Sequence, residues 1–301
     1  EKIGHLCDYI YFDSAWVGYE QFIPMLRDCS PLLLDLGPDD PGIIVSQSVH
    51  KHQAGFSMSS QIHKKDAHIK GQERYLPHKR LNNSFMVNAS TSPFYQVFAS
   101  LDMNARIQEG EGGALLWKEC MELSVEARKA VIRNKYLKPL VPPVVHGKNW
   151  EEWDTEEIIN DIAYFTFEPG GKWHSFQGYG KGQYFIDPMK LLFTTPGINV
   201  ETGRYEKFGI PGIVLANYLR ENAVIPEKCD LNDILFIITP AETKAKINNL
   251  ISRILHFEAF VDNDAPMAKV LPNIYHTYQD KYAGYTIRRL CQEMHDFYKE
   301  R

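Results

Sequence analysis

Two short apolar runs near the start of the chain predict its first strands. The segment "DYIYFD" covers residues 8–13 and "GIIVSQ" covers residues 42–47, and polar residues end each run. Runs of this length between turn residues are typical of buried strands. Between them, "SPLLLDLGPDDPG" holds the Pro, Gly and Asp that break a long helix. We therefore predict a loop-rich crossover between the two strands.

Apolar residues then recur at helical spacing from residue 93 to about 109, and again from about 115 to 135. This periodicity, with many good helix formers in the second stretch, predicts two consecutive helices separated by "EGEGG". The Pro-rich "LKPLVPPVV" interrupts the pattern and is the best candidate for an internal boundary.

Short strand patterns and helical patterns alternate after this boundary. We predict strands at "AYFTFEP", "KLLFTTPG" and "DILFIITP", and helices at about 210–221 and 242–260. Strands mixed with helices in this order indicate a smaller α+β unit. The pattern weakens after residue 264. The predicted fold class is therefore α/β.

Charge and composition argue against two classes of partner. The chain has 301 residues, 44% of them hydrophobic, and a net charge of −5 with basic residues scattered among acidic ones. This balance predicts no nucleic-acid partner. No apolar run reaches the roughly 18 residues of a membrane span, and the start lacks the pattern of a signal peptide. We expect no membrane partner and a cytoplasmic location.

The cysteines suggest neither a disulfide framework nor a zinc site. They are far apart and odd in number, without a C-x-x-C pair: Cys7, Cys29, Cys120, Cys229 and Cys291. Such spacing favours reduced, mostly structural thiols. The chain also begins at Glu1 and enters a strand pattern almost at once. Without an initiator Met, it is expected to be a piece of a longer chain.

Histidines and lysines crowd the segment "SQSVHKHQAGFSMSSQIHKKD", residues 46–66. One interpretation is a solvated charged loop, because most such runs are exposed. A metal site is a weaker interpretation, since the spacings match no common zinc pattern. The residues concerned are His50, Lys51, His52, His63, Lys64 and Lys65 within the segment and His68 just after it.

A third interpretation gives this segment a chemical role. Lys51 closely follows a strand that should be buried, which favours the neutral amine that a Schiff base requires. Asp13 ends another strand and could pair with the pyridine nitrogen of pyridoxal phosphate. Ser48 and His50 could donate hydrogen bonds to a phosphate. Spacing alone does not decide among the three interpretations.

A resemblance to a known family favours the third interpretation, the one that gives this segment a chemical role. "YFDSAWVGYEQF", "SQSVHKHQAGFSMSSQIHKKD", "ASTSPFYQVFASLD", "KWHSFQGYG" and "YFIDPMKLLFTTPGI" occur in the same order as similar motifs in the bacterial ornithine, lysine and arginine decarboxylases of the aspartate-aminotransferase fold type. The resemblance continues through "VIPEKCDLN" and "YTIRRLCQEMHDFY". These two motifs and "QSVHKHQAGF" are most similar to the ornithine branch. It implies the later part of a pyridoxal-phosphate-dependent, transferase-type large domain followed by a smaller α+β domain. The implied ranges are 1–110 for the large-domain portion, 111–264 for the small domain, and 265–301 for the start of a further domain.

The same resemblance implies roles around the cofactor. Lys51 is the expected Schiff-base residue, with Ser48 and His50 near the phosphate or ring. Asp13 takes the place of the partner of the ring nitrogen. Ala15 takes the place of the small residue against the ring. Asp13 could instead simply cap the next turn.

Further roles are implied outside this strand region. Thr91 and Ser92 resemble hydroxyls that reach a phosphate across a dimer interface, although Thr91 could be a helix N-cap. Glu227 resembles the carboxylate that reads the distal ammonium of the substrate, although it could pair with Lys228 on the surface. Trp173 and His174 resemble a segment close to the active site and receive no defined step.

The implied reaction is decarboxylation of a basic amino acid, most simply L-ornithine to putrescine, by a homodimer or larger homo-oligomer with shared active sites. Lysine decarboxylase, arginine decarboxylase and aminotransferase are alternatives with the same cofactor. A non-catalytic remnant or interaction module is the alternative from another class. Met58 departs from the glutamine usual at that place. Because the phosphate-cradling turn and neighbouring domains of the family are missing, this chain alone is expected to be inactive or barely active.

Overall fold

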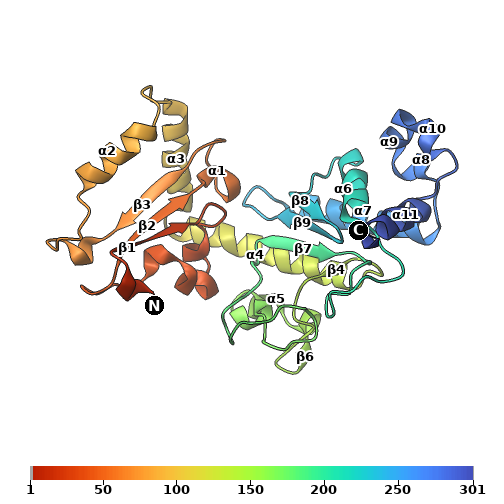
Figure 1. The fold of residues 1–301 in the computed structure, drawn as a ribbon, viewed down its shortest axis with the longest axis horizontal. Coiled ribbons are helices and arrows are strands. Elements are labelled where there is room, and N and C mark those ends of the chain that lie inside the picture. The colour runs from red at the N-terminus through yellow and green to blue at the C-terminus, as the bar shows by residue number, and fades with distance from the viewer. Residues whose placement is uncertain (1–2, 301) are drawn as a thin grey trace. The chain divides into compact units, whose positions relative to one another are not determined.

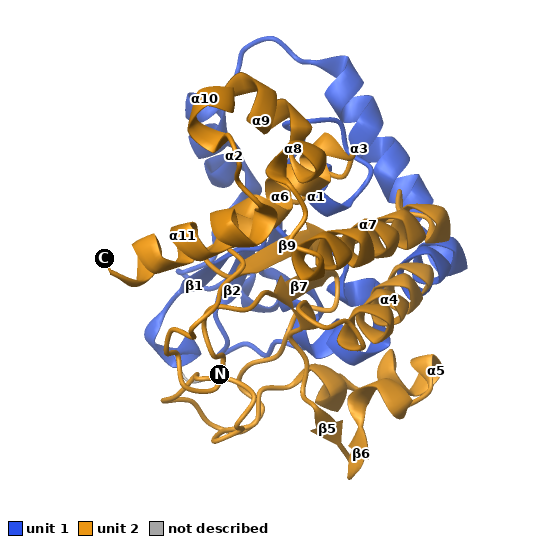
Figure 2. Cartoon of the chain, turned by 90° about the vertical axis from the view of Figure 1, so that its right-hand side faces the viewer, with its two compact units in different colours: residues 1–118 blue, residues 119–301 orange. Residues whose placement is uncertain are grey.

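The computed structural model describes residues 3–300 and divides into two compact units, residues 1–118 and 119–301 (Figures 1 and 2). Each unit mixes strands with helices, so the protein is of the α/β class that the sequence predicts. The units are described separately below. The domain ranges 1–110, 111–264 and 265–301 remain predictions.

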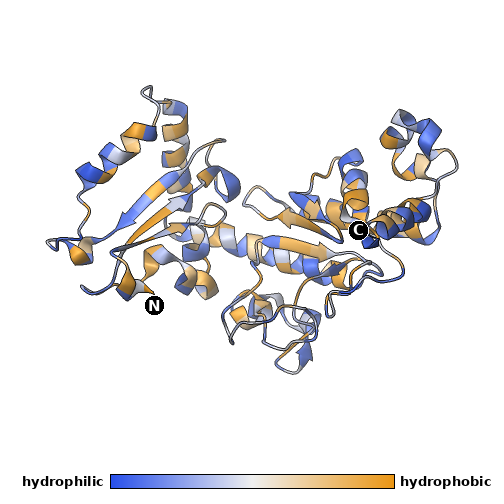
Figure 3. Cartoon of the chain, in the orientation of Figure 1, coloured by the Kyte–Doolittle hydropathy of each residue, from blue (hydrophilic) through white to orange (hydrophobic). Residues whose placement is uncertain are grey.

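The first unit is built on a sheet of three strands in the order β1–β2–β3. They are β1 (Tyr9–Asp13), β2 (Gly42–Gln47) and β3 (Gln61–Lys65). β1 and β2 are parallel and β3 is antiparallel to β2. β1 and β2 confirm the two predicted strands, and the buried Ile43 and Val45 show why β2 is apolar. Figure 3 shows its hydrophobic colour at the centre of the sheet.

The connection from β1 to β2 consists of turns and short 3₁₀ helices, as the Pro and Gly content predicts. Three α-helices follow β2 within this unit: α1 (Val49–His52), α2 (His78–Asn88) and α3 (Tyr95–Gln108). The 3₁₀ segments of this connection are Glu20–Phe22, Pro24–Cys29 and Pro31–Leu33, and the unit also has Gly4–Leu6 and Ala67–Ile69.

The long helix α4 (Gly110–Ile132) corrects the predicted linker "EGEGG". Only Glu109 separates α3 from α4, and the glycines belong to the first turn of α4. Trp117 explains this outcome, because its buried indole donates to Gln108 at 2.8 Å and packs on the Tyr19 ring at 4.9 Å. These contacts outweigh the low helix propensity of glycine.

The main sheet of the second unit has four antiparallel strands in the order β4–β7–β9–β8. They are β4 (Lys138–Pro139), β7 (Lys190–Thr194), β9 (Asp233–Ile237) and β8 (Lys228–Asp230), and a small hairpin adds β5 (Val144–Val145) and β6 (Lys148–Asn149). β7 and β9 confirm the strands predicted at "KLLFTTPG" and "DILFIITP". The Pro-rich segment supplies β4 and β5 inside this unit rather than the division between units.

The prediction of a strand at "AYFTFEP" is wrong. Residues Ile162–Phe165 form a 3₁₀ helix, and only an isolated bridge joins Thr166 to Phe185. The Asp161 carboxylate accepts the Ala163 N–H at 2.8 Å, which starts the helical turn. Phe165 is fully buried against the Trp150 ring, so the apolar run is used as a buried turn.

The helices predicted near 210–221 and 242–260 are confirmed by α6 (Gly212–Glu221) and α7 (Lys244–Asp262). The region of weak pattern after residue 264 is helical. The remaining helical segments are Trp150–Glu152, α5 (Thr155–Ile158), α8 (Met267–Val270), α9 (Pro272–Thr277), α10 (Gln279–Tyr282) and α11 (Ile287–Lys299). Within residues 3–300 no helix is both long enough and apolar enough to cross a membrane.

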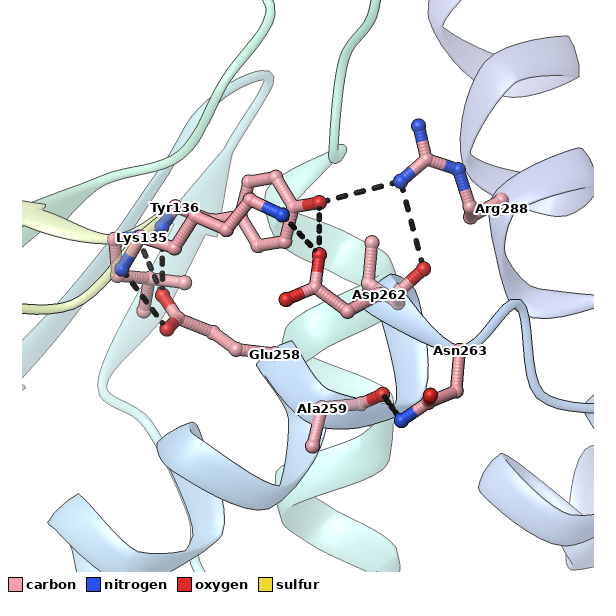
Figure 4. A network of polar contacts seen from close by, with 9 residues as sticks. Lys135, Tyr136, Glu258, Ala259, Asp262, Asn263 and Arg288 are labelled. Atoms are coloured by element: carbon pink, nitrogen blue, oxygen red, sulfur yellow. Dashed lines mark hydrogen bonds and ion pairs between the residues drawn. The ribbon is translucent and has the colours of Figure 1, made fainter.

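A buried carboxylate joins α7 to the turn before β4 (Figure 4). Glu258 is 6% exposed and accepts the backbone N–H groups of three successive residues, at 3.1, 2.9 and 2.8 Å, from Lys135, Tyr136 and Leu137. Charge-assisted bonds of this kind are stronger than neutral ones. Glu258 therefore fixes the path of the chain between α4 and the second sheet.

We predict that Glu258→Gln lowers the free energy of unfolding by about 1.5–3 kcal/mol, because an amide cannot accept all three N–H groups and leaves buried donors unsatisfied. Urea unfolding checks this through the midpoint at unchanged slope. Glu126→Gln is the matched control on α4, where the carboxylate is half exposed and pairs with Lys244 at 3.2 Å. Equal midpoints for the two variants would contradict the role given to Glu258.

Candidate active site

The predicted cofactor residues of the first unit gather where β1 and β2 end. Because the two strands are parallel and Asp13 is opposite Ser46, their carboxyl ends lie at the same edge of the sheet. α1 begins two residues after β2 and carries Lys51 on its single turn. The buried Val49 anchors this turn in the core. Asp13 and Lys51 are thus held by adjacent strands.

The Asp13 carboxylate is exposed and only weakly engaged. Oδ1 accepts the Ala15 N–H at 3.2 Å and the Ser46 hydroxyl at 3.5 Å. Ser46 Oγ also lies 2.7 Å from the Tyr11 hydroxyl. The bond to the Ala15 N–H means that Asp13 caps the following turn, which was the alternative role considered from the sequence. The other carboxylate oxygen, Oδ2, takes part in neither of these bonds. This geometry leaves acceptor capacity for a further donor.

Lys51 lies near the turn that Asp13 shapes. Its Nζ is 5.2 Å from the centre of the Trp16 ring, a distance at which an ammonium is attracted to an indole face. The neighbouring His52 packs edge-on against Trp16 and Tyr19, with ring centres 6.1 and 5.2 Å apart. These aromatic contacts connect α1 to the segment that follows β1.

His50 has a defined hydrogen bond. Its Nδ1 lies 2.8 Å from the Ser59 carbonyl, which also accepts the His50 backbone N–H at 3.4 Å. Because a carbonyl only accepts, Nδ1 carries a proton, and Nε2 is an acceptor whenever the ring carries this proton alone. Ser48 occupies the N-cap position of α1 without making a side-chain capping bond. Its hydroxyl is half-buried at the same edge.

Several charged residues of this segment are not simply solvated. His52 is 3% exposed, and the side chain of Lys64 is 13% exposed and bonds to Asp66 at 2.6 Å. Lys65 donates to the Leu32 carbonyl at 2.9 Å, and His68 Nε2 lies 3.1 Å from the Pro41 carbonyl. Expecting a solvated loop here is wrong, because His52 is buried and Lys64, Lys65 and His68 bond to protein acceptors. Met58 is 86% exposed and has a φ of 70°, a backbone conformation unfavourable for a residue with a β-carbon.

Thr91 and Ser92 lie in the exposed connection between α2 and α3. The N-cap residue of α3 is Phe94, so Thr91 is not the cap considered from the sequence. α3 is anchored beside the segment after Lys51, since Asn104 accepts the Ala54 N–H at 2.9 Å and Ser100 accepts that of Phe56 at 3.1 Å. Within residues 3–300 we find no hydrogen bond from Thr91 or Ser92 to Lys51 or Asp13.

The other candidate residues belong to the second unit. Glu227 is exposed just before β8, where its N–H donates to the Leu235 carbonyl at 2.9 Å. Trp173 stacks on Phe167 with ring centres 4.9 Å apart. His174 is 4% exposed, and its Nε2 lies 3.2 Å from both the Glu168 carbonyl and the Tyr179 hydroxyl.

Sequence reasoning missed the contributions of Trp16, Ser46 and Ser59. Trp16 lies inside the quoted motif "FDSAW" but received no role. Ser46 could have been found only from the strand register, and Ser59 only from the fold of the following loop. In the described part of the chain, no group of three or more His, Cys, Asp or Glu residues could hold a metal ion.

The chain is similar to known proteins over nearly its whole length. The family described as Orn/Lys/Arg decarboxylase, major domain, matches residues 1–246. The inducible ornithine decarboxylase of Escherichia coli (strain K12) is 60% identical over 299 residues, which are 99% of this chain and 41% of the relative. The inducible ornithine decarboxylase of Lactobacillus sp. (strain 30a) is 61% identical over 301 residues, with shares of 99% and 41%.

A solved structure of a decarboxylase has a similar fold. The structure of the E. coli constitutive lysine decarboxylase superposes with a TM-score of 0.84 at 27% identity, over 97% of this chain and 39% of that one. The chain therefore spans about two fifths of the length of the curated relatives it matches. With a family match over residues 1–246, the chain belongs to the Orn/Lys/Arg decarboxylase major-domain family.

Proposed function

We propose that this chain carries the lysine-bearing part of the active site of a pyridoxal-phosphate-dependent decarboxylase, and that the substrate is L-ornithine. The observation that carries the proposal is the difference in identity: 60% to an ornithine decarboxylase against 27% to a structurally similar lysine decarboxylase. The products are putrescine and carbon dioxide. The proposed location is the cytoplasm, in keeping with five free cysteines.

The donor groups at the end of β1 and β2 fit this cofactor. A primary amine lies on α1 just after β2, a carboxylate with a free oxygen ends β1, and a half-buried serine hydroxyl is at the N-cap of α1: Lys51, Asp13 and Ser48. These match an aldehyde, a pyridine nitrogen and a phosphate in turn. When bound, pyridoxal phosphate supplies an electron sink for the electrons left behind as the substrate carboxylate departs.

The residues of the chain have separate tasks in this proposal. Lys51 supplies the amine that holds the cofactor, and the Trp16 face keeps this amine near the edge of the sheet. Asp13 holds a proton on the ring nitrogen through a charge-assisted bond. Ala15 leaves room for the ring because it has no side chain beyond Cβ. His50, fixed by the Ser59 carbonyl, offers Nε2 as an acceptor.

Glu227 is proposed to recognise the distal ammonium of the substrate. A carboxylate selects for a second positive charge, because a substrate without one leaves the carboxylate unpaired once water is excluded. Trp173 and His174 are proposed to lie near the substrate. The aromatic contacts of this pair keep both side chains in fixed orientations.

A second copy of the protein is the proposed partner. The surface of α2, α3 and their connection exposes a series of large apolar side chains, which are 51–82% exposed: Phe85, Met86, Val87, Phe94, Tyr95 and Phe98. Exposed apolar groups of this extent mark interaction surfaces. Thr91 and Ser92 lie within this series. A dimer formed here would carry their hydroxyls to the partner's cofactor, as the family resemblance implies.

The Lys51 assignment is tested in a chimera in which this chain replaces its matching segment of the E. coli inducible ornithine decarboxylase. We expect the chimera to release carbon dioxide from ornithine and to show the visible absorbance of bound cofactor. Lys51→Ala should abolish both, because no other amine forms the covalent link. The isolated chain should release little or none. Full turnover by Lys51→Ala would remove Lys51 from the cofactor site. An absence of cofactor absorbance in the intact chimera would support the remnant interpretation instead.

Asp13→Asn should lower kcat of the chimera by about a hundredfold or more, because an amide does not keep the ring nitrogen protonated. Steady-state kinetics and the wavelength of cofactor absorbance check this. Asp8→Asn is the control, an exposed acid just before the opposite end of β1. A matching loss in both variants would show that the effect is structural.

Glu227→Gln should lower kcat/KM for ornithine by about tenfold or more through loss of a charge-assisted contact, while leaving cofactor absorbance unchanged. Lysine and arginine are compared in the same assay, and the unmodified chimera should prefer ornithine. A preference for lysine or arginine would favour one of the alternative decarboxylases. Unchanged kinetics in Glu227→Gln would remove this residue from the substrate site.

A further inference from the structure

The second unit holds a pocket of about 340 Å³ beside the hairpin that joins β8 to β9. Apolar side chains cover much of its wall, among them Leu140, Leu192 and Val200. The hairpin residues Asp230 and Asp233 line the pocket as well. His174, proposed above to lie near the substrate, also lines this pocket, but no role proposed above accounts for its apolar walls and paired acids.

The acidic end of the pocket favours a cation. Asp230 and Asp233 are paired across the hairpin, which places two carboxylates on neighbouring positions. Burial raises the pKa of Asp233 and the charge of Asp230 raises it further, against smaller opposing effects of the Asp230 backbone N–H and Lys228. Burial and the neighbouring carboxylate both disfavour the charged form of Asp233. A cation bound beside the pair would favour that charged form.

His174 provides a second, independent observation. The side chain is 4% exposed and lines the pocket, and its Nδ1 is buried without a hydrogen-bond partner. Its Nε2 is already engaged by the Glu168 carbonyl and the Tyr179 hydroxyl. Buried polar atoms without a partner are rare in folded proteins. This unpaired nitrogen on a residue that lines the pocket is the second feature that points to a polar ligand.

The aromatic wall of the pocket is also suited to a cation. Phe176 lines this pocket and a neighbouring one of about 350 Å³, whose lining includes Phe167, Tyr179 and Tyr184. Phe176 is 58% exposed, so its ring is accessible. Aromatic faces attract ammonium groups, and apolar walls accommodate methylene groups.

We propose that this pocket binds a protonated aliphatic amine, with the ammonium at the Asp230–Asp233 end and the methylene stem along Leu140 and Leu192. The volume accommodates a short chain such as that of 1,4-diaminobutane. This binding does not depend on the proposed decarboxylase activity. If that activity is present, the ligand belongs to the same chemical class as its product.

The test is calorimetric titration of the cofactor-free, 301-residue chain with 1,4-diaminobutane, 1-aminobutane and the neutral 1,4-butanediol. Both amines should bind and the diol should not. Asp233→Asn and Asp230→Asn should each weaken amine binding by about tenfold or more. Asp280→Asn, an exposed acid on α10, is the matched control and should change nothing. Circular dichroism shows whether each variant keeps its fold.

Phe176→Leu is a second variant at a largely exposed position, and it should weaken amine binding severalfold without unfolding the chain. Glu227→Gln separates this site from the proposed substrate site, since amine binding here should survive that change. Equal binding of the diol, no amine binding, or binding lost only with Glu227→Gln would overturn the proposal. None of these outcomes bears on the Lys51 test, which reads cofactor absorbance and carbon dioxide.

Discussion

The parallel pairing of β1 with β2 is the constraint on which the proposed active site depends. Five residue pairs fix the register, from Tyr9 opposite Gly42 to Asp13 opposite Ser46. Side chains alternate between the two faces of a strand, so a slip of one residue would turn Asp13 to the other face. The Ser14 N–H continues the ladder to the Ser46 carbonyl at 2.9 Å. The turn carrying Ala15 and Trp16 therefore starts from a fixed position.

The fold could be predicted where local pattern and tertiary structure agree. The runs that became β1, β2, β7 and β9 are short, apolar and bounded by turn residues, so periodicity identified them. Periodicity failed where a tertiary contact determines the local structure. Glycines at the start of α4 are held helical by the buried Trp117. In the same way, a strand-like run became a 3₁₀ turn capped by Asp161.

For the candidate site, the sequence could indicate the chemical residues but not the contacts that orient them. Lys51 and Asp13 stand at strand ends and match a family motif, so sequence could indicate them, and their chemical roles remain proposals. The contacts that orient the site involve Ser46, Ser59 and Trp16, whose proximity depends on strand register and loop path. His52 shows the limit most clearly. Its charged neighbours indicated solvent, whereas Trp16 and Tyr19 enclose its ring.

Three carboxylates of this chain show how structural and functional acids differ physically. Glu258 is buried and its oxygens accept three backbone N–H groups, so little acceptor capacity remains for a ligand. Asp13 is exposed, with bonds of 3.2 and 3.5 Å to one oxygen only. Asp233 is half-buried beside another acid, which raises its pKa. The first arrangement stabilises a fold, whereas the other two leave charge or acceptor capacity that a cationic or protonated group can use. The number of donors already bonded to a carboxylate, more than its burial, therefore distinguishes an acid that holds the chain together from one that can bind a ligand.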